Sequence, residues 1–259
     1  MFLQNYLVVA PEEYQAAAPF CRNFTHAAYH IGGDSTLLRQ NLLLQTRGGI
    51  LCVSDRQAPG IPEPEKLCAA VQRECSRRGY TGVFLDFEQV LSSDRLAFAR
   101  QLAAQCASAR RPLYVTERCG KSVPGAIPLI GTAISGGNFA QYLQESSAKY
   151  DSASKAALDV QRLRMEFTLP SPTGCGKPLS GPELQQLMER QQPAVFFSED
   201  LCARYFTYRH EGETRFVLFD DAETISRKLR LGANLGFSAA FLLWAEIRDI
   251  AGGIQGLKQ

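Results

Sequence analysis

The stretch Tyr80-Thr81-Gly82-Val83-Phe84-Leu85-Asp86-Phe87-Glu88 decides the fold of this chain. Its only charges are the carboxylates of Asp86 and Glu88, at its carboxyl end. Side chains alternate along a strand, so Phe84, Asp86 and Glu88 share one face, and the other face carries Val, Leu and Phe. An apolar outer face is typical of a strand that helices cover, and α/β barrels keep their chemistry at the carboxyl ends of their strands. The stretch therefore predicts a buried strand that delivers two acids to a functional site.

The pattern on both sides of this stretch alternates between strands and helices. A helix is predicted over 64–78, with Pro64 near its start and Gly79 at its end. A second helix is predicted to begin at residue 92 or 93 and to carry an apolar stripe as far as Cys106. The other predicted strands are 6–10, 24–30, 49–54, 113–116, 128–134, 164–169 and 237–244, and the other predicted helices are 139–161, one from 182 and one over 221–231.

Repeated strand–helix units predict a parallel sheet, and the chain has 259 residues. That length is close to the roughly 250 residues of a typical (β/α)8 barrel. The segment from Phe196 to Phe219 departs from the repeat, because residues 205–209 and 215–219 read as two strands of an inserted β-hairpin. We expect a (β/α)8 TIM barrel, with a small inserted β-hairpin between the last strands and one domain over residues 1–259.

Composition excludes several classes of protein. The net charge is +2 with acids and bases interspersed, so we expect no nucleic-acid partner. Eight cysteines without a CxxC pair or a Cys/His cluster of ligand spacing indicate buried thiols in a reducing compartment, with no metal and no cofactor. No apolar run is long enough to span a membrane, and the first residues do not have the pattern of a signal peptide.

The segment from Thr81 to Glu88 resembles the fourth-strand signature of family 18 glycoside hydrolases, the chitinase-like enzymes, written D-G-x-D-x-D-x-E. Three later segments resemble the bacterial branch of that family that processes spore-cortex peptidoglycan. They are Tyr205–Arg209, Phe219–Ala222, and the final strand from Gly236 to Trp244. The resemblance covers the fourth strand and about 60 residues at the C-terminal end, and it implies the same barrel fold.

The resemblance also implies a reaction, the substrate-assisted retaining cleavage of β-1,4 bonds next to N-acetylglucosamine. Glu88 matches the general acid that protonates the glycosidic oxygen. Asp86 matches the carboxylate that orients the 2-acetamido group of the substrate, whose carbonyl oxygen attacks the anomeric carbon. Trp244 matches the aromatic floor under the sugar, although closure of the barrel core would explain it nearly as well. The implied partner is an N-acetylated glycan, either a muropeptide or a chitooligosaccharide.

Two departures from the family pattern concern activity. Thr81 and Phe84 stand where the signature has its first two acids, so the usual relay between the inner acids is absent. The sixth strand lacks the M-x-Y-D ending whose Tyr helps to hold the acetamido group, and Ser135, Asn138 and Tyr142 are the candidates to replace that Tyr.

Further candidate substrate-binding residues are Tyr29, His30, Glu117 and Tyr205. His30 lies on a predicted strand and Glu117 just past one, so both could reach the barrel mouth. For His30 a structural role is the more ordinary interpretation, and Tyr205 is expected to pack within the inserted hairpin or to line a cleft.

Two hypotheses remain open. In the first, the chain is a glycoside hydrolase acting on peptidoglycan or chitin-like glycans. In the second, it is a catalytically inactive, spore-associated chitinase-like protein that binds glycans or a protein partner. A metal-binding barrel enzyme is a weaker third possibility. We expect a cytoplasmic or spore-associated location, and the sequence leaves the oligomeric state open.

Overall fold

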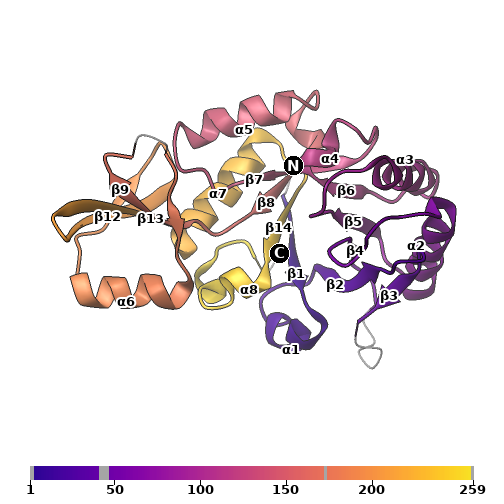
Figure 1. Ribbon diagram of the computed structural model, residues 1–259, viewed down its shortest axis with the longest axis horizontal. Coiled ribbons are helices and arrows are strands. Elements are labelled where there is room, and N and C mark those ends of the chain that lie inside the picture. The colour runs from indigo at the N-terminus through magenta and orange to yellow at the C-terminus, as the bar shows by residue number, and fades with distance from the viewer. Residues whose placement is uncertain (1–2, 41–46, 172–173, 258–259) are drawn as a thin grey trace.

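Within the described residues, eight parallel strands close into a barrel (Figure 1). The computed structural model describes residues 3–40, 47–171 and 174–257. The barrel closes because β1 pairs with both β14 and β2. In chain order the barrel strands are β1 (Gln4–Val9), β2 (Phe24–Ile31), β4 (Ile50–Ser54), β5 (Gly82–Asp86), β6 (Leu113–Thr116), β7 (Ile127–Gly131), β8 (Ala157–Val160) and β14 (Ala239–Leu243). The predicted TIM barrel is confirmed.

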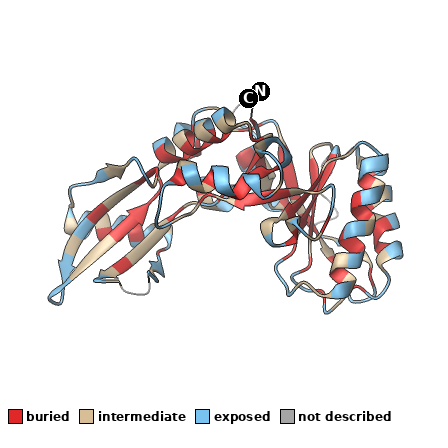
Figure 2. Ribbon diagram, turned by 90° about the horizontal axis from the view of Figure 1, so that it is seen from above, coloured by how far each residue is buried: buried red, intermediate tan, exposed pale blue. Residues whose placement is uncertain are grey.

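Helices cover the outside of the barrel, and β3 (Leu37–Arg39) extends the sheet by pairing antiparallel with β2. Figure 2 shows buried residues on the strands and on the inward sides of the helices. The helices around the barrel are α1 (Tyr14–Ala17), α2 (Pro64–Arg78), α3 (Ser93–Ser108), α4 (Glu117–Gly120), α5 (Phe139–Ala148), α7 (Ala222–Leu235) and α8 (Trp244–Ile247), with 3-10 turns at Pro11–Glu13, Ala153–Lys155 and Ala251–Gly253. No helix in the described ranges is long and apolar enough to cross a membrane.

Strand β5 has the two faces that its sequence predicts. Val83, Leu85 and Phe87 are fully or almost fully buried in the layer between the strands and helices α2 and α3. Phe84 points into the barrel, where it packs with Tyr6, Ile50, Cys52, Tyr114, Leu129, Ala157, Ala239 and Phe241. The barrel interior is therefore a packed apolar plug below the acids, and only its carboxyl-terminal mouth is open to chemistry.

The insertion between β8 and α7 is larger than a hairpin. It forms a five-stranded antiparallel sheet in the order β10-β9-β13-β12-β11, and α6 (Gly181–Gln191) packs on one face of it (Figure 1, orange). Its strands are β9 (Arg164–Leu169), β10 (Lys177–Pro178), β11 (Phe196–Ser198), β12 (Ala203–His210) and β13 (Glu213–Phe219). The predicted hairpin is present as β12 and β13.

Two predicted elements differ from the structure. The helix predicted over 139–161 ends at Ala148, and the residues after it form β8. Strand 164–169 exists but belongs to the inserted sheet instead of the barrel, since it pairs antiparallel with β10 and β13. Alternation shows that a segment is a strand, but not which sheet completes it. The prediction of one domain over residues 1–259 stays a prediction. Residues 1–2, part of the N-terminal stretch on which the expectation about a signal peptide rests, lie outside the described residues.

The two ends of the insertion meet at Leu163 and Asp220. The Asp220 N–H donates to the Leu163 carbonyl oxygen at 2.8 Å, and the Leu163 N–H donates to Oδ2 of Asp220 at 2.9 Å. Lys228 of α7 donates to the same carboxylate at 2.8 Å and to the carbonyl oxygen of Thr132 at 3.2 Å. Both side chains of the Asp220–Lys228 ion pair are fully buried. This cluster fixes the insertion to the barrel.

Candidate active site

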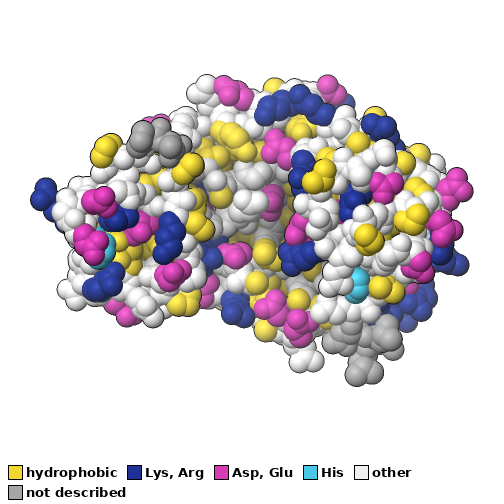
Figure 3. Space-filling model, viewed as in Figure 1, with side chains coloured by type: hydrophobic (Ala, Val, Ile, Leu, Met, Phe, Trp, Pro, Cys, Tyr) yellow, Lys and Arg dark blue, Asp and Glu magenta, His cyan; other side chains and the backbone are white. Residues whose placement is uncertain are grey.

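A cavity of about 1580 Å³ occupies the barrel mouth and extends to the insertion. Figure 3 shows it as a hollow between the insertion and the barrel. The ends of β4, β5 and β8 form its barrel wall, while the start of β9 and residues 178–181 before and at the start of α6 form the opposite wall. Small-molecule pockets usually measure about 300–1,000 Å³, so this cleft has room for more than one sugar ring.

Asp86 is the deepest acid expected from the sequence, because it ends β5 directly above the apolar plug. Burial above all, and then the nearby carboxylates of Glu88 and Asp159, raise the pKa of Asp86 to about 6, against the opposing charge of Arg56. Asp86 therefore changes protonation state within the range where many enzymes work.

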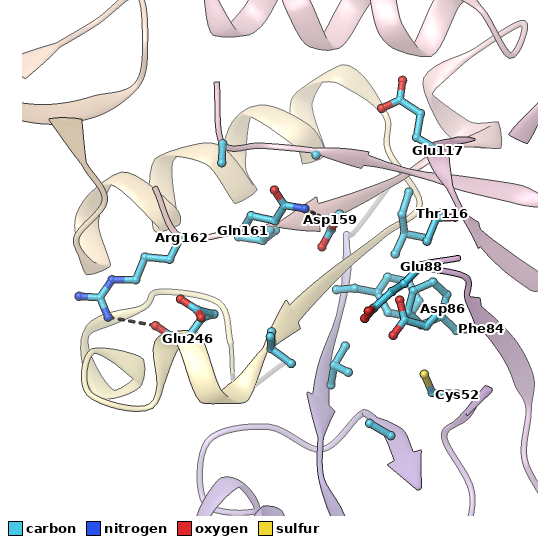
Figure 4. Close-up of a pocket in the computed structure, with 18 of the residues that line it drawn as sticks. Cys52, Phe84, Asp86, Glu88, Thr116, Glu117, Asp159, Gln161, Arg162 and Glu246 are labelled. Carbon is cyan, nitrogen blue, oxygen red and sulfur yellow. Dashed lines mark hydrogen bonds between the residues drawn. The ribbon is translucent and has the colours of Figure 1, made fainter. Parts of the chain in front are cut away.

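Asp159 faces the same cavity from β8, and Figure 4 shows it across the mouth from Asp86. Burial raises its pKa, while the side-chain amide of Gln161, which donates to Oδ2 at 2.7 Å, lowers it. Two carboxylates in a partly dry mouth disfavour simultaneous ionisation. The mouth thus retains two inward acids, although Phe84 has replaced one acid of the signature.

Glu88 lies just beyond β5 and is held at three places. Its carboxylate accepts two hydrogen bonds from Arg56, Nη2 to Oε1 at 2.6 Å and Nε to Oε2 at 2.9 Å. Its carbonyl oxygen accepts from Arg118 at 2.8 Å, and its N–H donates to Asp55 Oδ1 at 2.8 Å. Asp55 is in turn paired with buried Arg95, whose Nε donates to Oδ2 at 2.8 Å. The backbone of Glu88 is therefore rigidly placed at the rim.

Sequence reasoning missed four residues of this site: Arg56, Asp159, Gln161 and Glu246. Asp159 was missed because its segment was assigned to a helix. The signal that could have found it is the run Ala157-Leu158-Asp159-Val160, an apolar strand whose one polar side chain faces inward, as in β5. Arg56 and Glu246 lie in loop and short-helix positions that give no periodic signal.

Three of the predicted substrate-binding residues line the cleft: Tyr29, His30 and Glu117. Tyr29 nevertheless is buried, and its hydroxyl donates to Glu74 at 2.8 Å and contacts Tyr80 at 3.0 Å, so its polar end faces α2 instead of the cavity. Ser135 and Tyr142, two of the candidates to replace the sixth-strand Tyr, also line the cleft.

The other three predicted contacts lie outside the residues that line the cavity. Asn138 caps α5 by accepting from the Gln141 N–H at 3.1 Å. Tyr205 packs on the inserted sheet between Phe196 and Phe216. Trp244 is only 4% exposed and packs against Phe20, so a sugar platform does not fit its burial.

Hydrogen bonds and salt bridges join the start of the insertion to α8 and the residues after it. Arg162 donates to the carbonyl oxygen of Glu246 at 3.0 Å (Figure 4). Arg164 pairs with the Glu246 carboxylate. Arg162 also pairs with Asp249 at 2.6 Å. Across the described parts of the chain no group of three or more His, Cys, Asp or Glu side chains is placed to hold a metal ion.

Comparisons with solved structures find the same architecture in chitinases and spore enzymes. The spore cortex-lytic enzyme SleL of Bacillus cereus superposes with a TM-score of 0.66 at 16% identity, over 97% of this chain and 74% of that one. A chitinase from Chromobacterium violaceum ATCC 12472 gives 0.67 at 15% identity, over 98% and 99%. Human YKL-39, described as a pseudo-chitinase with retained chitooligosaccharide binding properties, gives 0.64 at 11% identity, over 93% and 92%.

No family model matches the sequence, and no curated protein matches it. Sequence identities as low as those of the three solved structures show a shared fold and nothing further. The structure is therefore a TIM barrel, and its fold is shared with a spore cortex-lytic enzyme, a chitinase and a pseudo-chitinase.

Proposed function

We propose that this protein is a glycoside hydrolase that cleaves β-1,4 bonds next to N-acetylglucosamine in peptidoglycan or chitin-like glycans. One observation carries the proposal: β5 delivers Asp86 and Glu88 together to the wall of an open cleft at the carboxyl end of the barrel. Cleavage of a glycosidic bond needs carboxyl groups of the enzyme that can reach the same substrate.

In the proposed mechanism the acetamido group of the substrate acts as nucleophile. Asp86 accepts a hydrogen bond from the acetamido N–H, which turns the carbonyl oxygen toward the anomeric carbon and stabilises the positive charge that develops. Glu88 protonates the leaving oxygen and then takes a proton from the water that opens the cyclic intermediate. The charge of Asp159 raises the pKa of Asp86. Asp159 would thus take over, from a different strand, the influence of the inner acid that the signature has at the position of Phe84.

The test is hydrolysis of muropeptides and of chitooligosaccharides by wild type, Glu88→Gln and Asp86→Asn. We expect loss of turnover by at least about 10²-fold in both variants, because each removes a group that acts in the transition state. Glu65→Gln, on the first turn of α2 outside the cleft, is the matched control and should retain activity. Equal rates in wild type and Glu88→Gln would refute the proposal.

The second candidate function is glycan binding without turnover. Two observations favour it: Phe84 fills the position of an inner acid, and Arg56 engages both oxygens of Glu88. The solved structure described as a pseudo-chitinase with retained chitooligosaccharide binding shows that a barrel of this kind can bind without acting. In that case the cleft would bind glycan with no release of sugars. A spore-associated or cytoplasmic location belongs to the same proposal and rests on the likeness to the SleL enzymes.

A further inference from the structure

Glu88 is the residue expected to donate a proton, yet its carboxylate is paired with Arg56. Both carboxylate oxygens accept hydrogen bonds from one guanidinium group, at 2.6 and 2.9 Å. The arrangement is the bidentate fork in which arginine recognises carboxylates. The fork occupies one lone pair on each oxygen of Glu88 and places a positive charge beside both, so a proton on either oxygen would compete with Arg56. The acid must part from Arg56 before it can act.

The surroundings allow only the side chains to separate. Asp55 and Arg118 fix the backbone of Glu88 at its N–H and its carbonyl oxygen. The backbone of Arg56 is held as well, because its N–H donates to Ser54 and its carbonyl oxygen accepts from Gln89. Arg56 itself has a side chain that is 71% exposed, and that of Glu88 is 40% exposed. Exposed pairs of this kind shift an equilibrium by about fivefold at most, so the fork can open readily.

Arg56 lines the same cleft as the acid it holds. A guanidinium group released from Glu88 keeps its charge and its planar donors, and it would pair with another carboxylate within reach. A glycan with a carboxylate substituent brings such a group into the cleft, whereas a neutral glycan does not. The position of Arg56 at the barrel rim, 71% exposed, makes it accessible to a bound chain.

We propose that Arg56 is a specificity residue that exchanges Glu88 for a carboxylate on the substrate, so that anionic N-acetylated glycans release the acid and neutral ones do not. The inference rests on the proposed function and names the substrate class within it. Arg56 binds the substrate and controls the position of Glu88, and it takes no part in bond breaking.

The experiment compares one glycan in two forms, with its carboxylates free and with them converted to methyl esters. For wild type we expect kcat/KM to be about two- to fivefold higher on the free acid form. For Arg56→Gln we expect a ratio near one, mainly because turnover of the ester form rises. Lys177→Gln removes a cation from the insertion, on the other side of the cleft, and should keep the wild-type ratio. An unchanged ratio in Arg56→Gln overturns the proposal.

A binding measurement keeps the test independent of turnover. Glu88→Gln removes the charge that Arg56 pairs with, so its affinity for the free acid form should exceed that of wild type by about two- to fivefold, with no gain for the ester. Glu88→Gln/Arg56→Gln should lose that gain. If no variant hydrolyses either form but the affinities follow this order, the proposed hydrolase function fails and the role of Arg56 stands. Equal affinities for both forms in Glu88→Gln overturn the role of Arg56.

Glycan chains stripped of their stem peptides distinguish the two sources of the carboxylate. If the ratio survives the stripping, the group that Arg56 recognises is on the sugar. If the ratio falls to one, the group is on the peptide.

Discussion

The buried carboxylate of Asp55 accepts a hydrogen bond from the backbone N–H of Glu88, with 2.8 Å between the two atoms. Asp55 is fully buried and shares its other oxygen with Arg95, which also donates to the carbonyl oxygen of Ala58 at 2.6 Å. The loops after β4 and β5 are therefore joined through one buried ion pair, and the rim position of Glu88 depends on it.

Asp55→Ala should destabilise the protein by about 3–5 kcal/mol, because it leaves the charge of Arg95 buried without a partner. Urea unfolding at neutral pH measures this change. Lys155→Ala, which breaks an exposed ion pair with Asp151, serves as the control and should cost less than about 1 kcal/mol. Similar losses of unfolding free energy in both variants would show that the Asp55–Arg95 pair stabilises the protein no more than an exposed ion pair does.

Asp86→Asn should stabilise the folded protein at pH 7.5 by about 1–3 kcal/mol. The pKa of Asp86 is raised from its ordinary 3.8 to about 6 in the folded state. Well below pH 3.8 the group is neutral in the folded and the unfolded state and does not affect stability. As pH rises from 3.8 through 6, the unfolded state releases the proton first, so the wild-type fold loses stability that Asp86→Asn keeps. Unfolding free energies of the two proteins should therefore coincide at pH 3 and differ at pH 7.5. The opposite order would place the folded pKa below the unfolded one.

Lys228→Met should cost about 3–5 kcal/mol, because it leaves the fully buried carboxyl group of Asp220 without its ion-pair partner. The double variant Lys228→Met/Asp220→Asn should recover part of the loss, since it removes both charges. Thermal or urea unfolding of the two single variants and the double variant gives the coupling energy. Strict additivity would mean that the two charges do not stabilise each other.

Gly49→Ala should destabilise the protein by more than about 1 kcal/mol. Gly49 has a φ of +71°, and a Cβ there would lie 2.3 Å from the carbonyl oxygen of Phe24. Gly136 provides the matched control, since a Cβ there meets nothing within 4 Å and its φ is not positive. We expect Gly136→Ala to be neutral or slightly stabilising. Comparable denaturation midpoints for the two variants would contradict the close approach of β2 to the start of β4.

Trp244→Ala should lower the free energy of unfolding by about 3–5 kcal/mol, as loss of a buried aromatic ring does. Trp244→Phe keeps most of the packing against Phe20 and should leave glycan affinity unchanged. Isothermal titration with a chitooligosaccharide checks the second expectation. A large loss of affinity in Trp244→Phe would return the ring to the role of sugar platform that the family resemblance implies.

The sequence predicted the part of the site that one strand carries. Strand β5 alternates strictly, so its inward acids and outward apolar face could be assigned from spacing alone. Strand β8 gives a weaker signal, because its four residues between a 3-10 turn and β9 are too few to show a clear period, and Ala and Leu favour helices intrinsically. Asp159 was lost with that strand.

Contacts between distant segments were beyond sequence reasoning for a different reason. Arg56 and Glu88 are 32 residues apart, and the parallel pairing of β4 with β5 brings the ends of the two strands side by side. The same holds for Trp244, for which the family resemblance implies a sugar platform and core packing is nearly as good an explanation. Its ring direction depends on α8 and on Phe20, which no local pattern reveals.

The reciprocal hydrogen bonds between Leu163 and Asp220 mean that the chain leaves the barrel and returns to it at a single point. The 56 residues between them form a cassette whose two ends are held together by these hydrogen bonds. The barrel positions the acids, and the cassette forms the far wall of the cleft. A change within this one segment would therefore alter the shape of the cleft opposite the acids, while the acids keep their places on the barrel strands.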